Sequence, residues 1–191
     1  MADMYFTMLP LMLGGVLNMV FTKTSLDRRY RSPMDGGKCC RDGKRLFGDN
    51  KTWIGFFSMI LFCTVLQLLF GLLCRLGNLD GHCDYYRLKP NTHSYNLLIG
   101  FLTGLVYMLS ELPNSFLKRR LNIADGKTGK GSKGRLFFVI DQIDSLVGVM
   151  LLVYLFSDIS LARYFLYVFL GGFTHIAINA GLYRMKVRKN L

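Results

Sequence analysis

The sequence predicts an all-α integral membrane protein, with five transmembrane helices in a single domain of 191 residues. Composition is the first indication: 51% of the residues are hydrophobic, 19% are charged, and the mean hydropathy of +0.29 exceeds that of most globular domains. The second is five apolar segments, each close to the roughly 20 residues that a helix needs to cross the hydrocarbon. No segment alternates like a lipid-facing barrel strand. We therefore expect a helical, multi-pass protein of the plasma membrane.

The helices are expected at residues 4–21, 53–76, 94–112, 137–156 and 161–182. The first has no basic region before it and no small-residue cleavage site after it, so we expect it to be retained rather than cleaved as a signal peptide. The second directly follows a loop of alternating charges. The third contains Gly100 and Gly104, whose spacing predicts a close helix contact, and ends near Glu111. The fourth carries Asp141 and Asp144 near its start, and the fifth leads into a basic tail. These acids are therefore expected near one membrane boundary.

Twenty of the 24 Lys and Arg residues lie on one side of the predicted helices. Nine are in the loop 23–52, seven are in the loop 113–136, and four are in the C-terminal tail. The other side carries only Arg75, Arg87, Lys89 and Arg163. Because cytoplasmic loops carry an excess of Lys and Arg, both basic loops and the C-terminus are predicted to be cytoplasmic and the N-terminus outside. An active site among these loops would face the cytoplasm.

Charges and glycines alternate before the second helix, in Asp42-Gly43-Lys44-Arg45-Leu46-Phe47-Gly48-Asp49-Asn50-Lys51-Thr52-Trp53. Glycines let backbone amides approach a phosphate, and Lys and Arg neutralise its charge. A hydroxyl at a helix start, such as that of Thr52, can donate to it. A basic run alone is more often a solvated face that sets topology. Topology does not require interleaved acids and glycines, so this segment favours a phosphate site.

A second polar cluster follows the third helix. If that helix continues through Pro113, then Glu111, Ser115, Lys118 and Arg119 stand along one face. Such a face would present an acid, a hydroxyl and two cations to the same neighbour. Pro113 can kink the helix at this point.

Asp141 and Asp144 are three residues apart, so they also share one helix face. Acids at a membrane boundary are costly unless they are paired or bound to metal, and they therefore indicate a functional site. Mg²⁺ takes one or two carboxylates together with substrate phosphates. The structural alternative is a salt bridge from either acid to Arg119 or Arg120.

These segments resemble the CDP-archaeol synthase family, a small branch of the CTP:phosphatidate cytidylyltransferases. The likeness is carried by the segment from Asp42 to Phe56, by Ser115-Phe116-Leu117-Lys118-Arg119-Arg120 and by Asp141-Gln142-Ile143-Asp144. It extends to Pro33, Asp35, Lys38, His175, Asn179 and Tyr183, and so covers nearly the whole chain in order. The sequence departs from the family at Ser110-Glu111, where Gly-Asp is expected. It also has a glycine and lysine stretch, Gly126–Gly134, which we interpret as a solvated linker in preference to a lid over the nucleotide.

The resemblance implies a Mg²⁺-dependent enzyme that joins CTP to a lipid phosphate of the archaetidic or phosphatidic acid type, giving a CDP-lipid and pyrophosphate. It implies that Asp141 and Asp144, with Glu111, hold the metal. Lys118 and Arg119 would bind the lipid phosphate or stabilise the leaving group. The other predicted substrate-binding residues are Lys44, Arg45, Asp49, Lys51, Thr52, Ser115 and Asn179, of which Lys44, Arg45, Lys51 and Thr52 would cradle the triphosphate.

Two other classes of function are compatible with the residues alone. A small ion-coupled transporter or lipid flippase would also use intramembrane acids, although the sequence has no convincing internal repeat of the kind common in such proteins. A structural protein that binds anionic lipids would explain the cations but not the acids. Nucleic-acid binding is not expected, because topology explains the cations. The sequence leaves open which lipid phosphate is used and whether the chain forms a homodimer.

Overall fold

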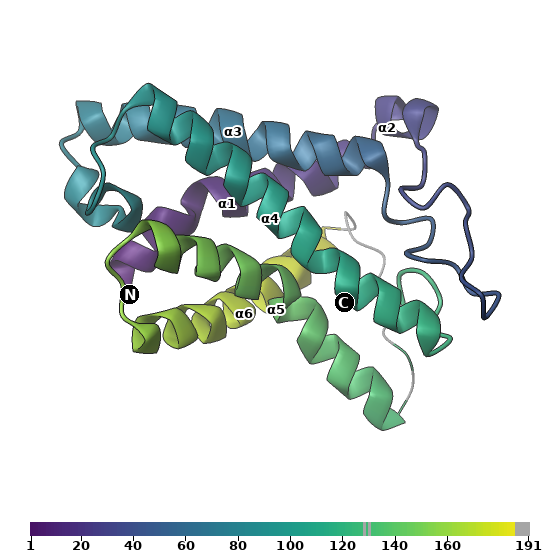
Figure 1. Cartoon of the computed structure of the whole chain (residues 1–191). Coiled ribbons are helices and arrows are strands. Elements are labelled where there is room, and N and C mark those ends of the chain that lie inside the picture. Colours follow the sequence, from purple (N-terminus) through teal and green to yellow (C-terminus); the bar gives the residue numbers. More distant parts are fainter. Residues whose placement is uncertain (128, 130, 186–191) are drawn as a thin grey trace.

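The computed structural model describes residues 1–127, 129 and 131–185 of the chain. It contains five long helices, α1 (Ala2–Phe21), α3 (Trp53–Leu76), α4 (His93–Arg120), α5 (Gly131–Phe156) and α6 (Leu161–Arg184). Short helices lie between them: α2 (Ser25–Tyr30), η1 (Asp80–His82) and η2 (Asp84–Tyr86). All five long helices are long and apolar enough to cross a membrane, and the described residues form no β-strand (Figure 1). The predicted all-helical architecture with five spans is confirmed.

The long helices pack mainly against their neighbours in the sequence. α1 contacts α3, α3 contacts α4, α4 contacts α5, and α5 contacts α6. The α3–α4 contact is close because two glycines face it: a Cβ on Gly104 would lie 2.6 Å from Ile60 Cα, and one on Gly100 would lie 2.7 Å from Thr64 Cα. The predicted close packing at these glycines is confirmed. Large apolar side chains on the outer faces, such as that of Leu61, remain exposed, as expected for helices surrounded by lipid.

Side-chain caps define the starts of three long helices. The hydroxyl oxygen of Thr52 accepts a hydrogen bond from Gly55 N (3.2 Å), that of Thr92 from Tyr95 N (3.2 Å), and that of Ser160 from Arg163 N (3.3 Å). A cap of this kind satisfies one of the free amides in the first turn. The limits of α3 and the start of α6 accordingly agree with the sequence prediction.

Two limits differ from the prediction by more than two residues. α4 continues past the expected end at residue 112, through Pro113, to Arg120, and α5 begins at Gly131 rather than at residue 137. The segment 113–136 is therefore largely helical, and only a short connection links α4 to α5. The extension of α4 is stabilised where its polar face meets acids of α5, and it realises the continuation through Pro113 that would place Glu111, Lys118 and Arg119 along one helix.

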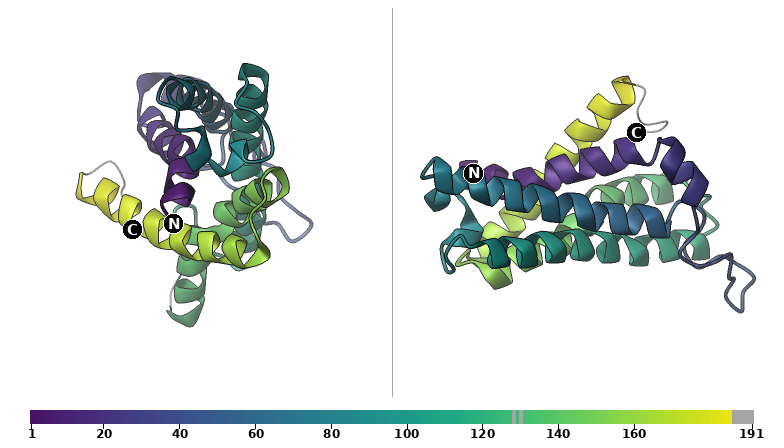
Figure 2. Two further views of the ribbon diagram at one scale, coloured as in Figure 1. Left: turned by 90° about the vertical axis from the view of Figure 1, so that its left-hand side faces the viewer. Right: turned by 90° about the horizontal axis from the view of Figure 1, so that it is seen from above.

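The two basic loops lie at the same end of the helix bundle (Figures 1 and 2). The N-terminus, η1, η2 and the turn between α5 and α6 lie at the other end. There the buried carboxylate of Asp84 accepts a hydrogen bond from Tyr167 on α6 (3.1 Å), while its backbone N–H donates to Thr7 on α1 (2.8 Å). These bonds connect α1 and α6 through η2 at the end far from the basic loops.

Candidate active site

A cavity of about 570 Å³ opens at the end of the bundle that carries the basic loops. Its walls come from α1, α3, α4, α5 and α6 and from both loops. The predicted site residues that line it are Lys51, Thr52, Glu111, Ser115, Lys118, Arg119, Asp141 and Asp144. Residues far apart in the sequence thus converge on one polar cavity. The predicted residues outside its lining are Lys44, Arg45, Asp49 and Asn179.

Asp141 and Asp144 lie opposite the extended part of α4. Lys118 Nζ is 2.5 Å from Asp141 Oδ2, and Asn114 Nδ2 donates to Asp141 Oδ1 and Asp144 Oδ2, both at 2.7 Å. The structural alternative placed Arg119 or Arg120 at these acids. That pairing is wrong for the described structure, because Arg119 pairs with Asp125 and the cation beside Asp141 is Lys118.

Glu111 forms an ion pair with Lys51, which lies just before Thr52, the residue that caps α3. The two side chains are 19% and 20% exposed, so the pair is largely shielded from solvent. Within the described residues, no three His, Cys, Asp or Glu side chains are grouped so that they could hold one metal ion. Glu111 therefore does not form the expected three-acid set with Asp141 and Asp144, and its partner is a cation of the other motif.

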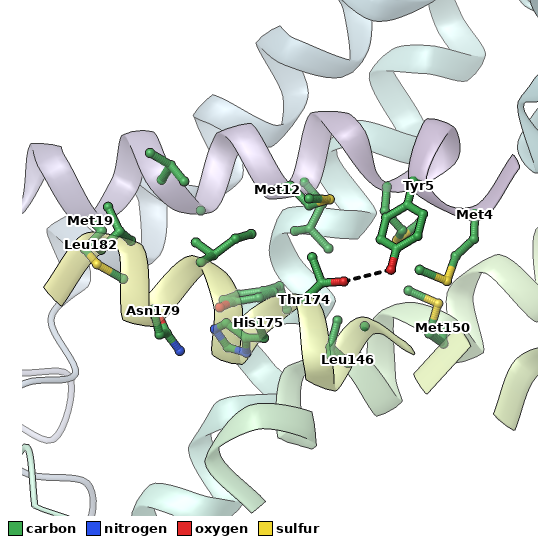
Figure 3. A pocket seen from close by; sticks show the side chains of 17 residues that line it. Met4, Tyr5, Met12, Met19, Leu146, Met150, Thr174, His175, Asn179 and Leu182 are labelled. Atoms are coloured by element: carbon green, nitrogen blue, oxygen red, sulfur yellow. Dashed lines mark hydrogen bonds between the residues drawn. The ribbon is translucent and has the colours of Figure 1, made fainter. Parts of the chain in front are cut away.

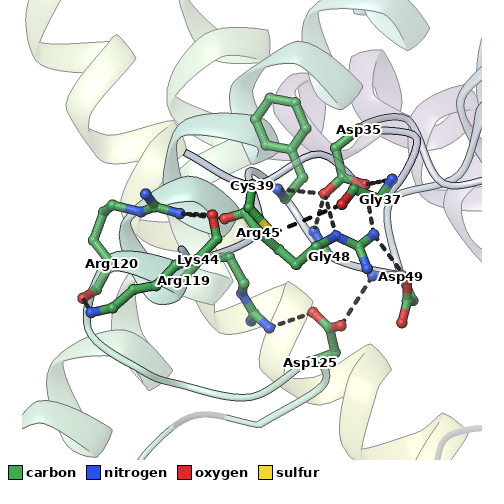
Figure 4. Close-up of polar contacts among 11 residues, drawn as sticks. Asp35, Gly37, Cys39, Lys44, Arg45, Gly48, Asp49, Arg119, Arg120 and Asp125 are labelled. Atoms are coloured by element: carbon green, nitrogen blue, oxygen red, sulfur yellow. Dashed lines mark hydrogen bonds and ion pairs between the residues drawn. The ribbon is translucent and has the colours of Figure 1, made fainter. Parts of the chain in front are cut away.

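The loop between α2 and α3 is organised around the buried carboxylate of Asp35 (Figure 4). Arg45 donates to both of its oxygens (2.6 and 3.2 Å), and the backbone amides of Gly37, Phe47 and Gly48 donate at 2.9–3.0 Å. Burial by itself would raise the pKa of Asp35, but these hydrogen bonds outweigh it and hold the pKa far below its ordinary value. In return, the hydrogen bond to Asp35 raises the pKa of Arg45. Arg45 thus stabilises the loop.

Asp125, which follows α4, links this loop to the end of that helix. Asp125 accepts from Arg119 through one oxygen (2.5 Å) and from Asp49 N through the other (3.0 Å). Gly48 has φ +95°, and a Cβ there would lie 2.1 Å from Asp125 Oδ1, so only glycine fits at this position. The contact brings Asp125 and Arg119 to the cavity wall while Asp49 stays outside it.

Arg120 forms a second set of contacts between the loop and α4, and Lys44 takes part in it. The guanidinium of Arg120 pairs with Asp42 (2.6 Å) and donates to the backbone oxygens of Lys44 (2.9 Å) and Arg45. Lys44 Nζ donates back to Arg120 O (2.7 Å). The predicted cradle residues Lys44 and Arg45 are therefore engaged in holding the loop on α4.

Several cavity residues were not singled out from the sequence, namely Asn114, Asp125, Gly126 and Lys127. A signal existed for Asn114, since it lies three residues after Glu111 and four before Lys118 and so shares their helix face. Asp125 had no comparable signal. Gly126 and Lys127 belong to the stretch interpreted as a linker, of which residues 128 and 130 lie outside the described residues. The described part of that stretch reaches the cavity and then enters α5.

An apolar pocket of about 80 Å³ lies between α1 and α6 (Figure 3). It shares Gly15, Met19, Tyr107 and His175 with the polar cavity, so the two spaces adjoin. Asn179 lines the apolar pocket, where its amide donates to Gln142 Oε1 (3.0 Å). The structure thus places this predicted substrate-binding residue at an apolar neighbour of the polar cavity.

The chain is similar to known proteins over most of its length. The family model of CarS-like CDP-archaeol synthases matches residues 2–190. A CDP-archaeol synthase of Pyrococcus abyssi is 32% identical over 157 residues, which cover 81% of this chain and 80% of the relative. One of Methanococcus aeolicus is 26% identical over 157 residues, or 82% and 81% of the two chains. A solved structure, described as an intramembrane enzyme for archaeal membrane lipid biosynthesis, matches 92% of each chain with a TM-score of 0.62 and 22% identity, and shows the same fold.

Proposed function

Since this chain belongs to the CDP-archaeol synthase family, and is thus a multi-pass membrane enzyme that acts as a CTP-dependent cytidylyltransferase, we propose that it converts CTP and a lipid phosphate into a CDP-lipid and pyrophosphate. The names of its relatives favour an ether-linked isoprenoid lipid phosphate of the archaetidic acid type. One structural observation carries the proposal. A polar cavity lined by acids and cations adjoins an apolar pocket between α1 and α6.

The cavity would open to the cytoplasm, with the N-terminus outside and the C-terminus inside. This orientation is supported by the excess of Lys and Arg in the two loops, which lie together at the cavity end. CTP is a cytoplasmic nucleotide and needs this access. The lipid would arrive from within the membrane, because its chains do not leave the bilayer.

Asp141 and Asp144 are the proposed ligands of Mg²⁺. Their oxygen donors suit this hard cation, and Asp144 has no Lys, Arg or His partner within 4.0 Å among the described residues. When bound, Mg²⁺ would neutralise phosphate charge and polarise the reacting phosphorus centre. Asp141 and Asp144 would also set where that centre lies, since both project from one face of α5.

The cations at the cavity wall would orient the two substrates. Lys51 lies just before Thr52, the residue that caps the start of α3, and suits the triphosphate. Lys118, one helix turn from Asn114 beside the acids, suits the lipid phosphate. In the reaction an oxygen of the lipid phosphate bonds to the α-phosphorus of CTP, and the bond from that phosphorus to the β-phosphate oxygen breaks. Its electron pair leaves with pyrophosphate, so positioning and charge neutralisation suffice and no nucleophilic side chain is needed.

The other predicted residues receive supporting roles. Arg45 and Asp49 would shape the loop beside the nucleotide, and Arg119 would hold Asp125 at the cavity wall. Ser115 would donate its hydroxyl within the cavity, and Asn179 would position Gln142 next to Asp141. Each of these residues would therefore act on substrate binding more than on the reacting atoms.

The proposal is tested by incubating purified protein with labelled CTP, Mg²⁺ and a panel of ether-linked and ester-linked lipid phosphates, and identifying the product by mass. We expect one CDP-lipid and equimolar pyrophosphate. Release of labelled pyrophosphate without lipid, or no consumption of CTP with any lipid phosphate, would contradict the proposal. The family does not favour the transporter or flippase, which would move its substrate without consuming CTP.

A further inference from the structure

A single amide side chain bridges the two proposed metal ligands. Asn114 is 6% exposed, and its Nδ2 donates to Asp141 Oδ1 and to Asp144 Oδ2, both at 2.7 Å. Ionised carboxylates only accept hydrogen bonds, so the two protons of the amide nitrogen serve one acid each. The acids, about one turn apart on α5, are thus held on either side of one side chain from α4.

The other end of the same amide is unsatisfied. Asn114 Oδ1 is buried and has no hydrogen-bond partner among the described residues. Leaving a buried carbonyl oxygen unpaired is unfavourable, and such a group in a native structure requires an explanation. Asp144 presents a second imbalance, because its oxygens are met by Asn114 and by the backbone N–H of Ser145 (2.7 Å) but by no cation of the described chain. The amide with the unpaired oxygen therefore faces, through its nitrogen, a carboxylate that has no cationic partner among the described residues.

We propose that Asn114 is a third protein ligand of the divalent cation and reaches it by a half-turn of its amide group. The turn exchanges Nδ2 and Oδ1, which differ little in size, and it directs the carbonyl oxygen between Asp141 and Asp144. The neutral oxygen ligand suits Mg²⁺ and adds no charge to a site that must also accept phosphates. The amide protons hold the two carboxylates in place when the cation is absent. This inference rests on the proposed Mg²⁺-dependent function.

The proposal predicts different effects for two substitutions at one position. Asn114→Ala removes both the donor and the ligand oxygen, so the affinity for Mn²⁺ should fall at least tenfold. Asn114→Asp keeps a ligand oxygen but loses the donor. It should bind Mn²⁺ at least as tightly as wild type, and in EDTA it should melt at a lower temperature because three carboxylates then repel one another.

The measurement is a titration of the full chain in detergent with Mn²⁺ and no nucleotide, in which free Mn²⁺ is followed by electron paramagnetic resonance. Asn18→Ala is the matched control: Asn18 also lines the cavity, but its Oδ1 accepts from Ser58 (2.6 Å). Its affinity for Mn²⁺ should equal that of wild type. A wild-type affinity in Asn114→Ala would overturn the ligand role, as would a wild-type protein that binds no Mn²⁺ under these conditions.

A second readout follows the amide itself. In protein labelled with [¹⁵N]asparagine, the NH₂ signal of Asn114 is identified by its disappearance in Asn114→Asp. Saturating Mg²⁺ should shift this signal, because its protons leave the two carboxylates. An unshifted signal would mean that Asn114 only bridges the two acids and does not bind the cation. If CTP turnover persists while this test fails, only the ligand role is lost, whereas absence of turnover with every lipid phosphate would remove the proposed function itself.

Discussion

Asp35→Asn is expected to open the loop between α2 and α3 while the helices stay folded. The carboxylate of Asp35 accepts two hydrogen bonds from Arg45 and one each from the backbone amides of Gly37, Phe47 and Gly48. An asparagine keeps the size, but its NH₂ group faces donors and cannot accept from them. Removing one partner of a buried ion pair costs about 3–5 kcal/mol. The loop should therefore lose about that much local stability.

The assay is hydrogen exchange of the loop 33–49, followed by mass spectrometry. Because about 1.4 kcal/mol corresponds to a tenfold change in an equilibrium, a loss of about 3 kcal/mol raises the open population roughly 100-fold. Asp49→Asn is the matched control: Asp49 pairs with the same Arg45 (2.9 Å), but its side chain is 68% exposed, and the expected cost is below about 1 kcal/mol. Equal exchange in wild type and Asp35→Asn, or equal effects of both substitutions, would refute the reasoning.

The sign of the pH dependence follows from the same contacts. The pKa of Asp35 lies far below the ordinary 3.8, so the folded loop favours the ionised form. Its stabilisation is complete above the ordinary pKa and is lost as the pH falls below that value toward the folded pKa. Wild-type protein should therefore lose this contribution only below about pH 4. Asp35→Asn should lack it at every pH.

Three further outcomes are expected. Asp144→Asn should abolish turnover with little loss of thermal stability, because Asp144 has no basic partner among the described residues. If the variant instead lost thermal stability while its folded fraction kept full turnover, Asp144 would serve the fold and not the reaction. Lys51→Ala should weaken CTP binding by about 1.5–3 kcal/mol in calorimetric titration, and Glu111→Gln, which frees Lys51, should weaken it less. In the Lys89→Cys variant, a thiol reagent applied outside intact cells should label the new cysteine but not Cys39, and both positions are exposed on the protein surface. Labelling of Cys39 alone would show that the topology is the reverse of the proposed one.

The sequence was sufficient to predict the membrane helices, because hydropathy and length determine them directly. The limits of α3 were correct since Thr52 supplies a cap. The end of α4 was not, because the apolar segment ends near residue 112 and Pro113 can kink a helix, whereas the helix continues to Arg120 and is stabilised by contacts of Asn114 and Lys118 with α5. Propensity is a weak guide where tertiary contacts of this kind oppose it.

Most of the charged residues that line the cavity were predicted from the sequence, but the contacts between them were not. Charge patterns identified Lys51, Glu111, Lys118 and the two acids of α5, all of which line it. Their partners depend on which helices become neighbours, and sequence spacing carries that information only within one helix. The ion pair between Lys51 and Glu111 joins the two motifs where α3 and α4 pack together, and no local sequence pattern predicts it.

The order of helix contacts has a consequence for how the protein is made. The long helices pack mainly against their neighbours in the sequence, so a chain leaving the ribosome can assemble helix by helix as it inserts. Once α4 has emerged, Glu111 can meet Lys51 and Arg120 can fasten the first loop. Asp141 and Asp144 arrive only with α5. A nascent chain can thus form the proposed phosphate-binding surface one helix earlier than it acquires the two acids proposed as metal ligands.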